Sequence, residues 1–456
     1  MGRFSLIALC AFAVAAPLQA ETLQSAVRSA ISSNPAQKAA RADTQASALE
    51  LLELRREYMP RVTLNASLGG NVVNNPTSLS ATDNGTTKLA NQIGVSAELV
   101  LFDGHRRANL IYGNAARLDG SILRLLDASE TMALNAVEAY VDVVRHAQLL
   151  HVAKSNVSRH QVIARQVRDL VSGGGLPESA RLQVQDRVLA AQLAQTEVES
   201  ALQNARDRYK SVIGHAPRGQ MSLPTPGNLP RSRAALIQRA IANSADIRFA
   251  NTQIQQRIAD EGIAQSANKP RVSLNADLSA GNNLNGSSGR QTEAFLGLRL
   301  NWTLFEGGQE QRDAALATRV RQAHHNKASS ERDVREIAAR AWTTHQSAQQ
   351  TLNLIAGQER ANIALVRQYK DEFDAAQRTL LDVLEAERAL FNIRFQRVSS
   401  EASVVFAKYR ILAAQSRLAS HFGARSANVA LIPGYAGRAQ TNARDVVFDT
   451  AIPALE

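Results

Sequence analysis

The stretch "KPRVSLNADL" at residues 269–278 nearly repeats the stretch "MPRVTLNASL" at residues 59–68. The repetition continues downstream, where "LFDG" at 101–104 is answered by "LFEG" at 304–307. The chain therefore carries two copies of a unit of roughly 200 residues. A period of this length indicates a duplicated, domain-sized element rather than a short solenoid repeat.

Each copy of the repeated phrase alternates apolar and polar side chains, which predicts a strand with one apolar and one polar face. A loop rich in Asn, Gly, Ser and Thr follows, at 71–91 and 281–292, and a second alternating run comes after it. Each copy thus predicts one β-hairpin, at about 61–102 and 271–305. Strands of this length match an oblique crossing of an outer membrane. A soluble sheet with one buried face has the same local pattern, so alternation alone leaves both open.

Aromatic side chains lie near the predicted strand ends, where a membrane barrel carries its aromatic girdle. Four strands from one chain cannot close a pore, because lipid does not tolerate open sheet edges. If these strands span a membrane, several chains must share one barrel, and three chains give twelve strands. The predicted girdle residues are Phe102, Trp302 and Phe305.

The N-terminus predicts an export signal. Arg3 precedes an apolar run at 4–16, and a small-residue cleavage site ends at Ala20, so the mature chain begins at Glu21. A buried N-terminal helix is the alternative. The only cysteine, Cys10, lies inside this signal and follows a leucine, which is unlike a lipoprotein, so we expect neither lipidation nor disulfides.

The formal net charge of the chain is +11. The arginines are scattered among Glu and Asp along the predicted helices. This distribution is unlike the concentrated basic patch of a nucleic-acid-binding protein, and export argues against that partner as well. The mature chain contains no apolar run long enough for a transmembrane helix. We therefore expect a periplasmic or outer-membrane protein.

Two long segments, 121–172 and 358–422, contain neither glycine nor proline. A helix from about 106 to 171 would be on the order of 100 Å long, which globular helices seldom reach. In the last helix, heptad-like apolar residues form one seam from Val383 to Leu418 and a second from Leu384 to Leu412. Two adjacent seams let a helix pack neighbours on both sides, as in the wall of a cylinder. A four-helix bundle core is the plainer alternative.

Reversals of the chain separate the long helices. In the first copy, "VSGGGLPES" at 171–179 supplies three glycines and a proline, which predicts a turn at 172–177. The second copy has "AAQRTLLDV" at 375–383, without a breaker. Because "LQVQDR" at 182–187 falls on "LEAERA" at 384–389, the repeat predicts a second turn near 376–380.

The order of signal, helix, hairpin and two long helices, given twice, resembles the TolC family of outer-membrane channels. The resemblance covers about 22–422. Its motifs are "AISSNP" at 30–35 and the more specific "RTLLDVLEAERALFNIR" at 378–394. The latter, with "YRILAAQSRL" at 409–418, looks closest to the branch that serves type I secretion, including agglutination-type exporters.

The resemblance implies a mainly α-helical protein with a membrane β-barrel. Three protomers would close a twelve-stranded barrel and a helical tunnel through the periplasm of a Gram-negative cell. The expected domains are a signal at 1–20, a first repeat at 21–220, a linker at 221–230, a second repeat at 231–422 and an irregular tail at 423–456. The second repeat would again hold a helix, a hairpin and a long helix pair.

The resemblance also implies partners. The trimer would sit in outer-membrane lipid, and its tunnel would meet a periplasmic adaptor and an inner-membrane ABC or proton-driven transporter, which supplies the energy. We expect a passive exit duct for type I protein secretion. Multidrug or small-molecule efflux is the alternative role. The sequence names neither the cargo nor the adaptor.

Residues at the hairpin tips can be carried over by position. Asp382 and Glu385 match acidic residues of the closed periplasmic entrance, where three copies would form carboxylate rings. Without the resemblance, both are ordinary acids favoured at a helix start. The expected closure network holds Arg378, Phe373 in place of a common tyrosine, and Glu178 as a substitute for an aspartate where this chain has Ala180. The expected adaptor-contact residues are Gly173, Gly174, Gly175, Leu176, Pro177, Thr379 and Leu380.

No catalytic, phosphate-binding or metal-binding signature is present, so we expect no enzyme activity, cofactor or metal. A periplasmic coiled-coil adaptor would also be exported and helical. It would need a lipoyl-like or barrel domain beside one hairpin, rather than two duplicated units. An exported enzyme is the third hypothesis, and the lack of any site argues against it.

Overall fold

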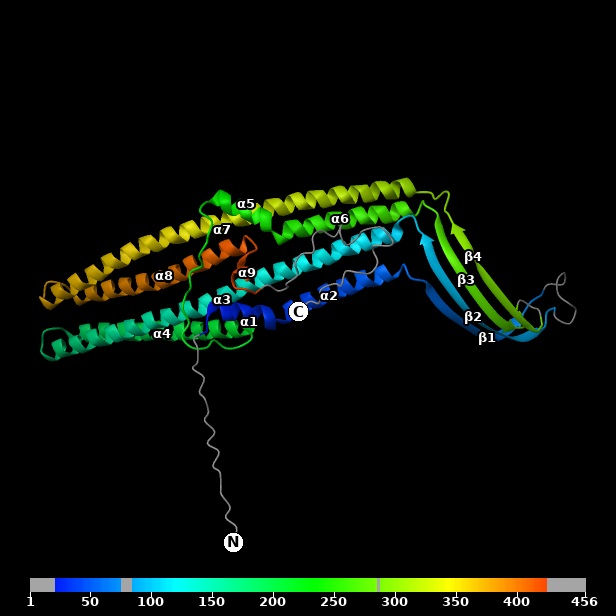
Figure 1. Ribbon diagram of the computed structural model, residues 1–456. Coiled ribbons are helices and arrows are strands. Elements are labelled where there is room, and N and C mark those ends of the chain that lie inside the picture. Colours follow the sequence, from blue (N-terminus) through cyan, green and yellow to red (C-terminus); the bar gives the residue numbers. More distant parts are fainter. Residues whose placement is uncertain (1–20, 75–83, 285–287, 425–456) are drawn as a thin grey trace, which may run out of the picture. The chain divides into compact units, whose positions relative to one another are not determined.

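The computed structural model describes residues 21–74, 84–284 and 288–424 (Figure 1). The expected signal segment and nearly all of the expected C-terminal tail lie outside these described residues. The described chain combines long helices with four antiparallel strands, which confirms the predicted fold class. The helices are α1 (Leu23–Ser33), α2 (Pro35–Arg56), α3 (Arg106–Ser172), α4 (Glu178–Ile213), α5 (Arg233–Asn243), α6 (Ala245–Ser266), α7 (Gln309–Asp374), α8 (Leu380–Ala413) and α9 (Leu418–His421). The strands are β1 (Arg61–Val72), β2 (Thr87–Phe102), β3 (Arg271–Asn282) and β4 (Arg290–Asn301).

Helices α3 and α7 have the unusual length that the sequence predicts, 67 and 66 residues. In α3, glycines serve close packing. A Cβ on Gly113 would lie 3.1 Å from the Cβ of Ala259, and a Cβ on Gly120 would lie 3.0 Å from the Thr252 hydroxyl. Both neighbours belong to α6, so these glycines let α3 and α6 approach each other closely. None of the helices in the described ranges is both long and apolar enough to cross a membrane.

The chain divides into two compact units, and each draws on both sequence repeats. The sheet unit comprises the described residues between 38 and 128 and between 244 and 335. The hairpin unit comprises residues 21–37, 129–243 and 336–424. Matching segments of the two repeats therefore pack with each other, so neither repeat forms a compact body alone.

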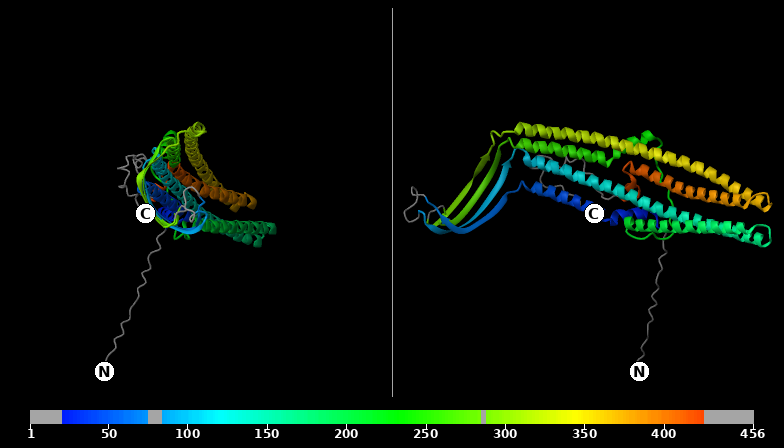
Figure 2. Two further views of the ribbon diagram at one scale, coloured as in Figure 1. Left: turned by 90° about the vertical axis from the view of Figure 1, so that its right-hand side faces the viewer. Right: turned by 180° about the vertical axis from the view of Figure 1, so that it is seen from behind.

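In the sheet unit, the four strands lie side by side in the order β1-β2-β3-β4, and every neighbouring pair is antiparallel (Figure 2). The register aligns apolar side chains across the strands. Leu64 lies opposite Val95, and Val95 lies opposite Leu278. Since alternation has a period of two, this register sends the apolar side chains of all four strands to one face.

The apolar face of the sheet is the exposed one. Leu64 is 66% exposed, Leu68 73% and Leu296 75%. On the opposite, polar face, Ser273 and Asn275 are each only 5% exposed. A sheet of a soluble protein buries its apolar face instead.

A buried arginine joins the sheet to the start of α3. The guanidinium of Arg107 donates to the carbonyl of Val100 at 3.0 Å and pairs with Asp103 at 2.8 Å. It also lies 4.2 Å from the centre of the Tyr58 ring, a cation–π contact. These contacts satisfy the buried charge and fix the angle at which strand β2 enters the helix.

In the hairpin unit, the short helix α1 lies at the centre of the largest apolar core. Its buried residues pack with α3, α4, α8 and α9. Thr22 caps its first turn by accepting the Ser25 amide, and Arg28 donates to the carbonyl of Phe422 at 2.8 Å. The core residues of α1 are Leu23, Ala26, Val27, Ala30 and Ile31.

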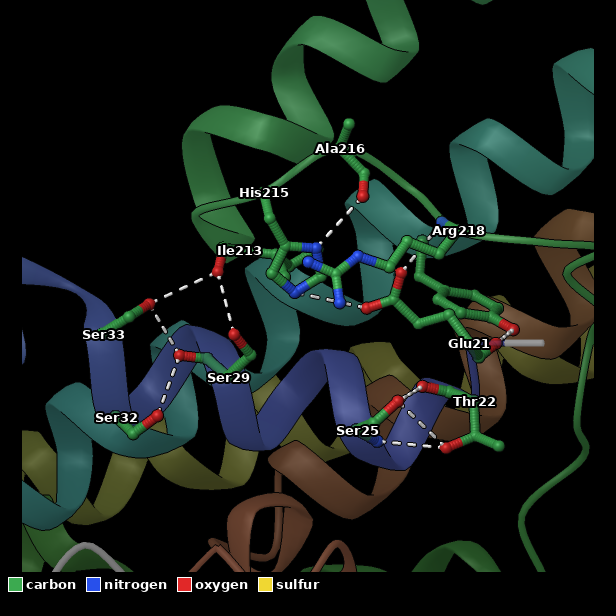
Figure 3. A network of polar contacts seen from close by, with 11 residues as sticks. Glu21, Thr22, Ser25, Ser29, Ser32, Ser33, Ile213, His215, Ala216 and Arg218 are labelled. Carbon is green, nitrogen blue, oxygen red and sulfur yellow. Dashed lines mark hydrogen bonds and ion pairs between the residues drawn. The ribbon is translucent and has the colours of Figure 1, made fainter. Parts of the chain in front are cut away.

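Glu21, which precedes the capping residue Thr22, is held by the segment between α4 and α5 (Figure 3). The amide of Glu21 donates to the carbonyl of Arg218 at 3.2 Å, and the Glu21 carboxylate accepts the Arg218 amide at the same distance. His215 lies 3.4 Å from the other carboxylate oxygen. The Tyr140 hydroxyl donates to the Glu21 carbonyl at 3.0 Å. Burial, and then the Glu21 carboxylate, raise the pKa of the neighbouring Tyr209 hydroxyl.

Candidate functional site

The candidate site lies in the hairpin unit, where α3 turns into α4 and α7 turns into α8. The first turn ends α3 in a Schellman motif. The amide of Gly175 donates to the carbonyl of Leu170 at 2.8 Å, and the amide of Gly174 to that of Val171 at 3.0 Å. Gly174 has φ +75°, the left-handed conformation that glycine adopts most readily.

The second turn has the same hydrogen bonds without a glycine. The amide of Gln377 donates to the carbonyl of Glu372 at 2.8 Å, and the amide of Ala376 to that of Phe373 at 2.9 Å. Ala376 has φ +60°. The repeat predicts a turn here, although the local sequence has no glycine or proline. The structure contains this turn.

Helix α8 begins with a capping box. The Thr379 hydroxyl accepts the Asp382 amide at 3.3 Å, and the Asp382 carboxylate accepts the Thr379 amide at 3.4 Å. Asp382 is therefore held at the positive end of the helix dipole within its own chain. This is the ordinary structural role of an acid at a helix start, and it leaves the second carboxylate oxygen for other partners.

Arg378 contacts several side chains of the second hairpin. It pairs with Glu372 at 2.8 Å and with Asp382 at 4.0 Å, and its guanidinium lies 4.3 Å from the centre of the Tyr369 ring. Hydrogen bonds from Gln368 and Arg378 lower the pKa of the Glu372 carboxyl. All these partners belong to the second hairpin, so these contacts of Arg378 do not tie the two hairpins together. Tyr369 was missed by sequence analysis.

Glu178 likewise bonds inside its own hairpin, to Arg181 three residues along α4. Of the predicted acidic residues, Glu385 alone reaches across, to Arg187 of α4 at 2.7 Å. Its side chain is 49% exposed, so solvent screens this ion pair. The predicted closure residues are thus brought to one end of the unit but divided between the hairpins.

Apolar contacts join the hairpin tips. Ala180 is 6% exposed and Leu380 7%, and both lie in one buried cluster to which Phe373 adds its ring. Sequence analysis placed Leu380 among the exposed adaptor-contact residues, but its side chain turns inward. Gly173, Gly174, Gly175, Pro177 and Thr379 are exposed, and Leu176 is half-buried. The cluster consists of Ile163, Val167, Ala180, Val184, Leu380 and Leu384.

A buried charged group on α8 escaped the sequence analysis. Glu387 is 1% exposed, and its carboxylate lies 2.6 Å from the ammonium of Lys370 and 3.7 Å from the guanidinium of Arg159. A signal was available, because Glu387 stands between Leu384 and Phe391 on an otherwise apolar seam. A charge in such a seam needs a partner when the seam is buried.

The predicted girdle residues lie in the sheet unit. Phe102 ends β2, while β4 ends at Asn301, so Trp302 and Phe305 follow the last strand. The register places the last residues of β2 and β4 at the same end of the strands. Trp302 donates to the carbonyl of Asn268 at 3.1 Å, and Phe305 is 90% exposed. In the part of the chain that the structure describes, no group of His, Cys, Asp and Glu could hold a metal ion.

Comparison with known proteins matches this architecture to one family. The family model described as outer membrane efflux protein matches residues 26–215 and again residues 236–423. The two matches correspond to the two copies of the sequence repeat and together take in most of the chain.

Individual proteins agree with that match. The chain is 24% identical to the outer membrane efflux protein BepC of Brucella suis biovar 1, over 87% of this chain and 86% of that protein. It is 23% identical to the outer membrane protein TolC of Salmonella enteritidis, over 83% of this chain and 78% of that protein. Among solved structures, CusC superimposes with a TM-score of 0.75 at 16% identity, covering 87% of this chain and 92% of CusC.

Proposed function

The chain belongs to the outer membrane efflux protein family, and on that basis we propose that three copies form the passive exit duct of a tripartite export system. Members of this family are outer-membrane transport channels and not enzymes. The protein is accordingly an outer-membrane efflux channel of the TolC type.

The observation that carries the proposal is the exposed apolar face of the sheet. Leucines on both outer strands are more than half exposed, whereas Ser273 and Asn275 on the other face are covered. Lipid is the environment that makes this orientation favourable, with the polar face toward a water-filled lumen. Three aromatic residues at one end of the strands would lie at the membrane interface, namely Phe102, Trp302 and Phe305.

The sheet edges favour a shared barrel. β1 and β4 are the edge strands of the described sheet, and each has one ladder of unpaired backbone groups. In lipid such edges must be closed, and pairing β4 of one copy with β1 of the next would close them. Three copies would then form a barrel of twelve strands.

The hairpin tips are the proposed periplasmic entrance and adaptor-docking end. The exposed glycines of the first turn and Thr379 of the second are accessible to a partner. In a trimer, Asp382 and Glu385 would each occur three times around one axis. Rings of carboxylates favour cations and disfavour anions, so the entrance would be cation-selective.

Protein secretion through an ABC transporter is the first candidate role, and it rests on the motif at 378–394. Small-molecule efflux is the second, because the relative BepC is named an efflux protein. Deleting the gene distinguishes them. Loss of one large secreted protein at unchanged drug susceptibility supports secretion. An unchanged supernatant with increased susceptibility supports efflux.

The membrane orientation is tested by Leu64→Arg, with Asn65→Arg as the matched control on the other face. Arginine at a lipid-facing position near the bilayer centre costs about 2–4 kcal/mol. We expect L64R to reduce the heat-modifiable trimer in outer-membrane fractions and N65R to leave it unchanged. Equal tolerance of both variants would rule out a lipid-facing apolar surface.

A further inference from the structure

One layer of the hairpin unit contains a buried carboxylate beside two cations. Glu387 of α8 is 1% exposed, and His160 of α3 is 4% exposed. Lys370 of α7 lies 2.6 Å from one Glu387 oxygen, and Arg159 of α3 lies 3.7 Å from the other. Three helices therefore meet at one negative charge.

The two ion pairs of Glu387 have different consequences. The pair with Lys370 stays within the second hairpin, since α7 and α8 are its two arms. The pair with Arg159 connects the second hairpin to the first. Among the described residues, the other ion pair between the two hairpins joins Arg187 and Glu385. That pair is exposed and screened, whereas the carboxylate of Glu387 is buried, where charges interact more strongly.

We propose that Glu387 is a gating residue of this channel, whose buried carboxylate ties the first hairpin to the second through Arg159 and so sets how readily the entrance opens. The proposal deepens the proposed function and rests on it. It assigns the tie to a different layer from Arg378 and Glu178, which bond within their own hairpins.

The same layer contains groups that would gain from separation of the hairpins. Both carboxylate oxygens of Glu387, the Nε and Nη2 atoms of Arg159 and the Nδ1 atom of His160 are buried, and within the described residues they form no hydrogen bond, so charge attraction alone holds Glu387. Water admitted on opening would satisfy these atoms, because an unpaired buried polar group is unfavourable. The attraction between Arg159 and Glu387 is therefore set against the unfavourable desolvation of these atoms, and this balance makes the packed arrangement of the two hairpins easy to release.

The test is single-channel recording of the purified full-length protein in planar lipid bilayers. We expect E387Q to raise the fraction of time in the open state at least roughly tenfold, because it removes the charge that Arg159 faces. R159Q should act in the same direction. The matched control is E336Q, which removes one partner of the exposed pair between Glu336 and Arg340 on α7.

A double variant shows whether the effect comes from the ion pair between Glu387 and Arg159 or from a general loss of packing. If Arg159 acts through Glu387, then R159Q added to E387Q changes the open fraction no further. Additive effects, or an E387Q channel that opens no more often than E336Q, would overturn the proposal. If E387Q does not assemble, the comparison of R159Q with E336Q decides it. Absence of any channel in the unaltered protein would instead refute the proposed function.

Discussion

Ala376 adopts at the second turn the left-handed backbone conformation that Gly174 adopts at the first, with φ angles of +60° and +75°. The two residues are equivalent in the repeat, and both donate the same turn hydrogen bond. An alanine Cβ makes this conformation unfavourable by roughly 1–2 kcal/mol. The second turn therefore holds strain that the first does not.

Ala376→Gly should stabilise the second hairpin by about 1 kcal/mol, since glycine adopts positive φ without a Cβ clash. The readout is the temperature at which heat-modifiable trimers dissociate. Ala375→Gly, one residue earlier and at ordinary φ, is the control and should give no increase. Gly174→Ala should lower the temperature. An unchanged A376G trimer would mean that this turn is not strained in the assembly.

Acid should weaken the layer around Glu387. Burial, more than any neighbouring charge, lowers the pKa of His160 below its usual 6.5. Glu387 opposes this shift, while Arg159, Arg187 and Lys370 add to it. The folded protein thus favours neutral histidine. As the pH falls through 6.5, the unfolded chain takes up the proton first, so stability declines until the folded-state pKa is passed.

The measurement is trimer dissociation temperature against pH, between about pH 7 and pH 4. Variant H160Q should lose the part of the decline that begins near pH 6.5. His324, an exposed histidine on α7, provides the control variant H324Q, which should keep the unaltered profile. Identical profiles for H160Q and the unaltered protein would show that His160 is not the titrating group.

The segment between α4 and α5 should loosen when its tyrosine contacts are removed. The Tyr409 hydroxyl donates to the carbonyl of Pro224 at 3.0 Å. The Tyr140 hydroxyl donates to the carbonyl of Glu21, whose amide in turn bonds to Arg218 of this segment. Tyr409→Phe and Tyr140→Phe each remove one hydrogen bond, worth about 1 kcal/mol. Faster tryptic cleavage after Arg218 is the expected result. Unaltered cleavage kinetics in both variants would argue against this role.

Asp382 and Thr379 allow the cap to be separated from the proposed charge ring. Thr379→Ala removes the capping hydroxyl and should cost about 1 kcal/mol while leaving cation selectivity intact. Asp382→Asn should reduce selectivity as well, measured as a shift of reversal potential in a salt gradient. Equal selectivity for D382N and the unaltered channel would leave Asp382 with the structural role alone.

Much of the fold follows from local sequence. The repeated phrase predicts both β-hairpins, because alternation over ten residues specifies strands and the intervening Gly- and Asn-rich loops specify turns. The absence of glycine and proline over 121–172 predicts the length of α3. The turn at Ala376 is different, since nothing local marks it. It was predicted only because the first copy carries glycines at the same place.

The partners of individual charges could not be predicted in this way. Arg378 and Glu178 were expected in one network, but each pairs with a near neighbour in its own hairpin. Leu380 was expected outside, yet it packs with Ala180. Such outcomes depend on how α8 is rotated against α3 and α4. A periodic pattern fixes which face is apolar, whereas it does not fix which neighbour each charged residue meets.

The bond from Arg28 to the carbonyl of Phe422 spans 394 residues and lies beside the core around α1. Helix α1 thus finds packing partners in a segment that is synthesised almost four hundred residues later. The N-terminal helix must wait, unfolded and with its apolar side exposed, until α8 and α9 have been delivered to the same compartment. Contacts of such separation form slowly. The chain is therefore vulnerable to aggregation and proteolysis during its passage, because the core around α1 closes only after α9 has been made.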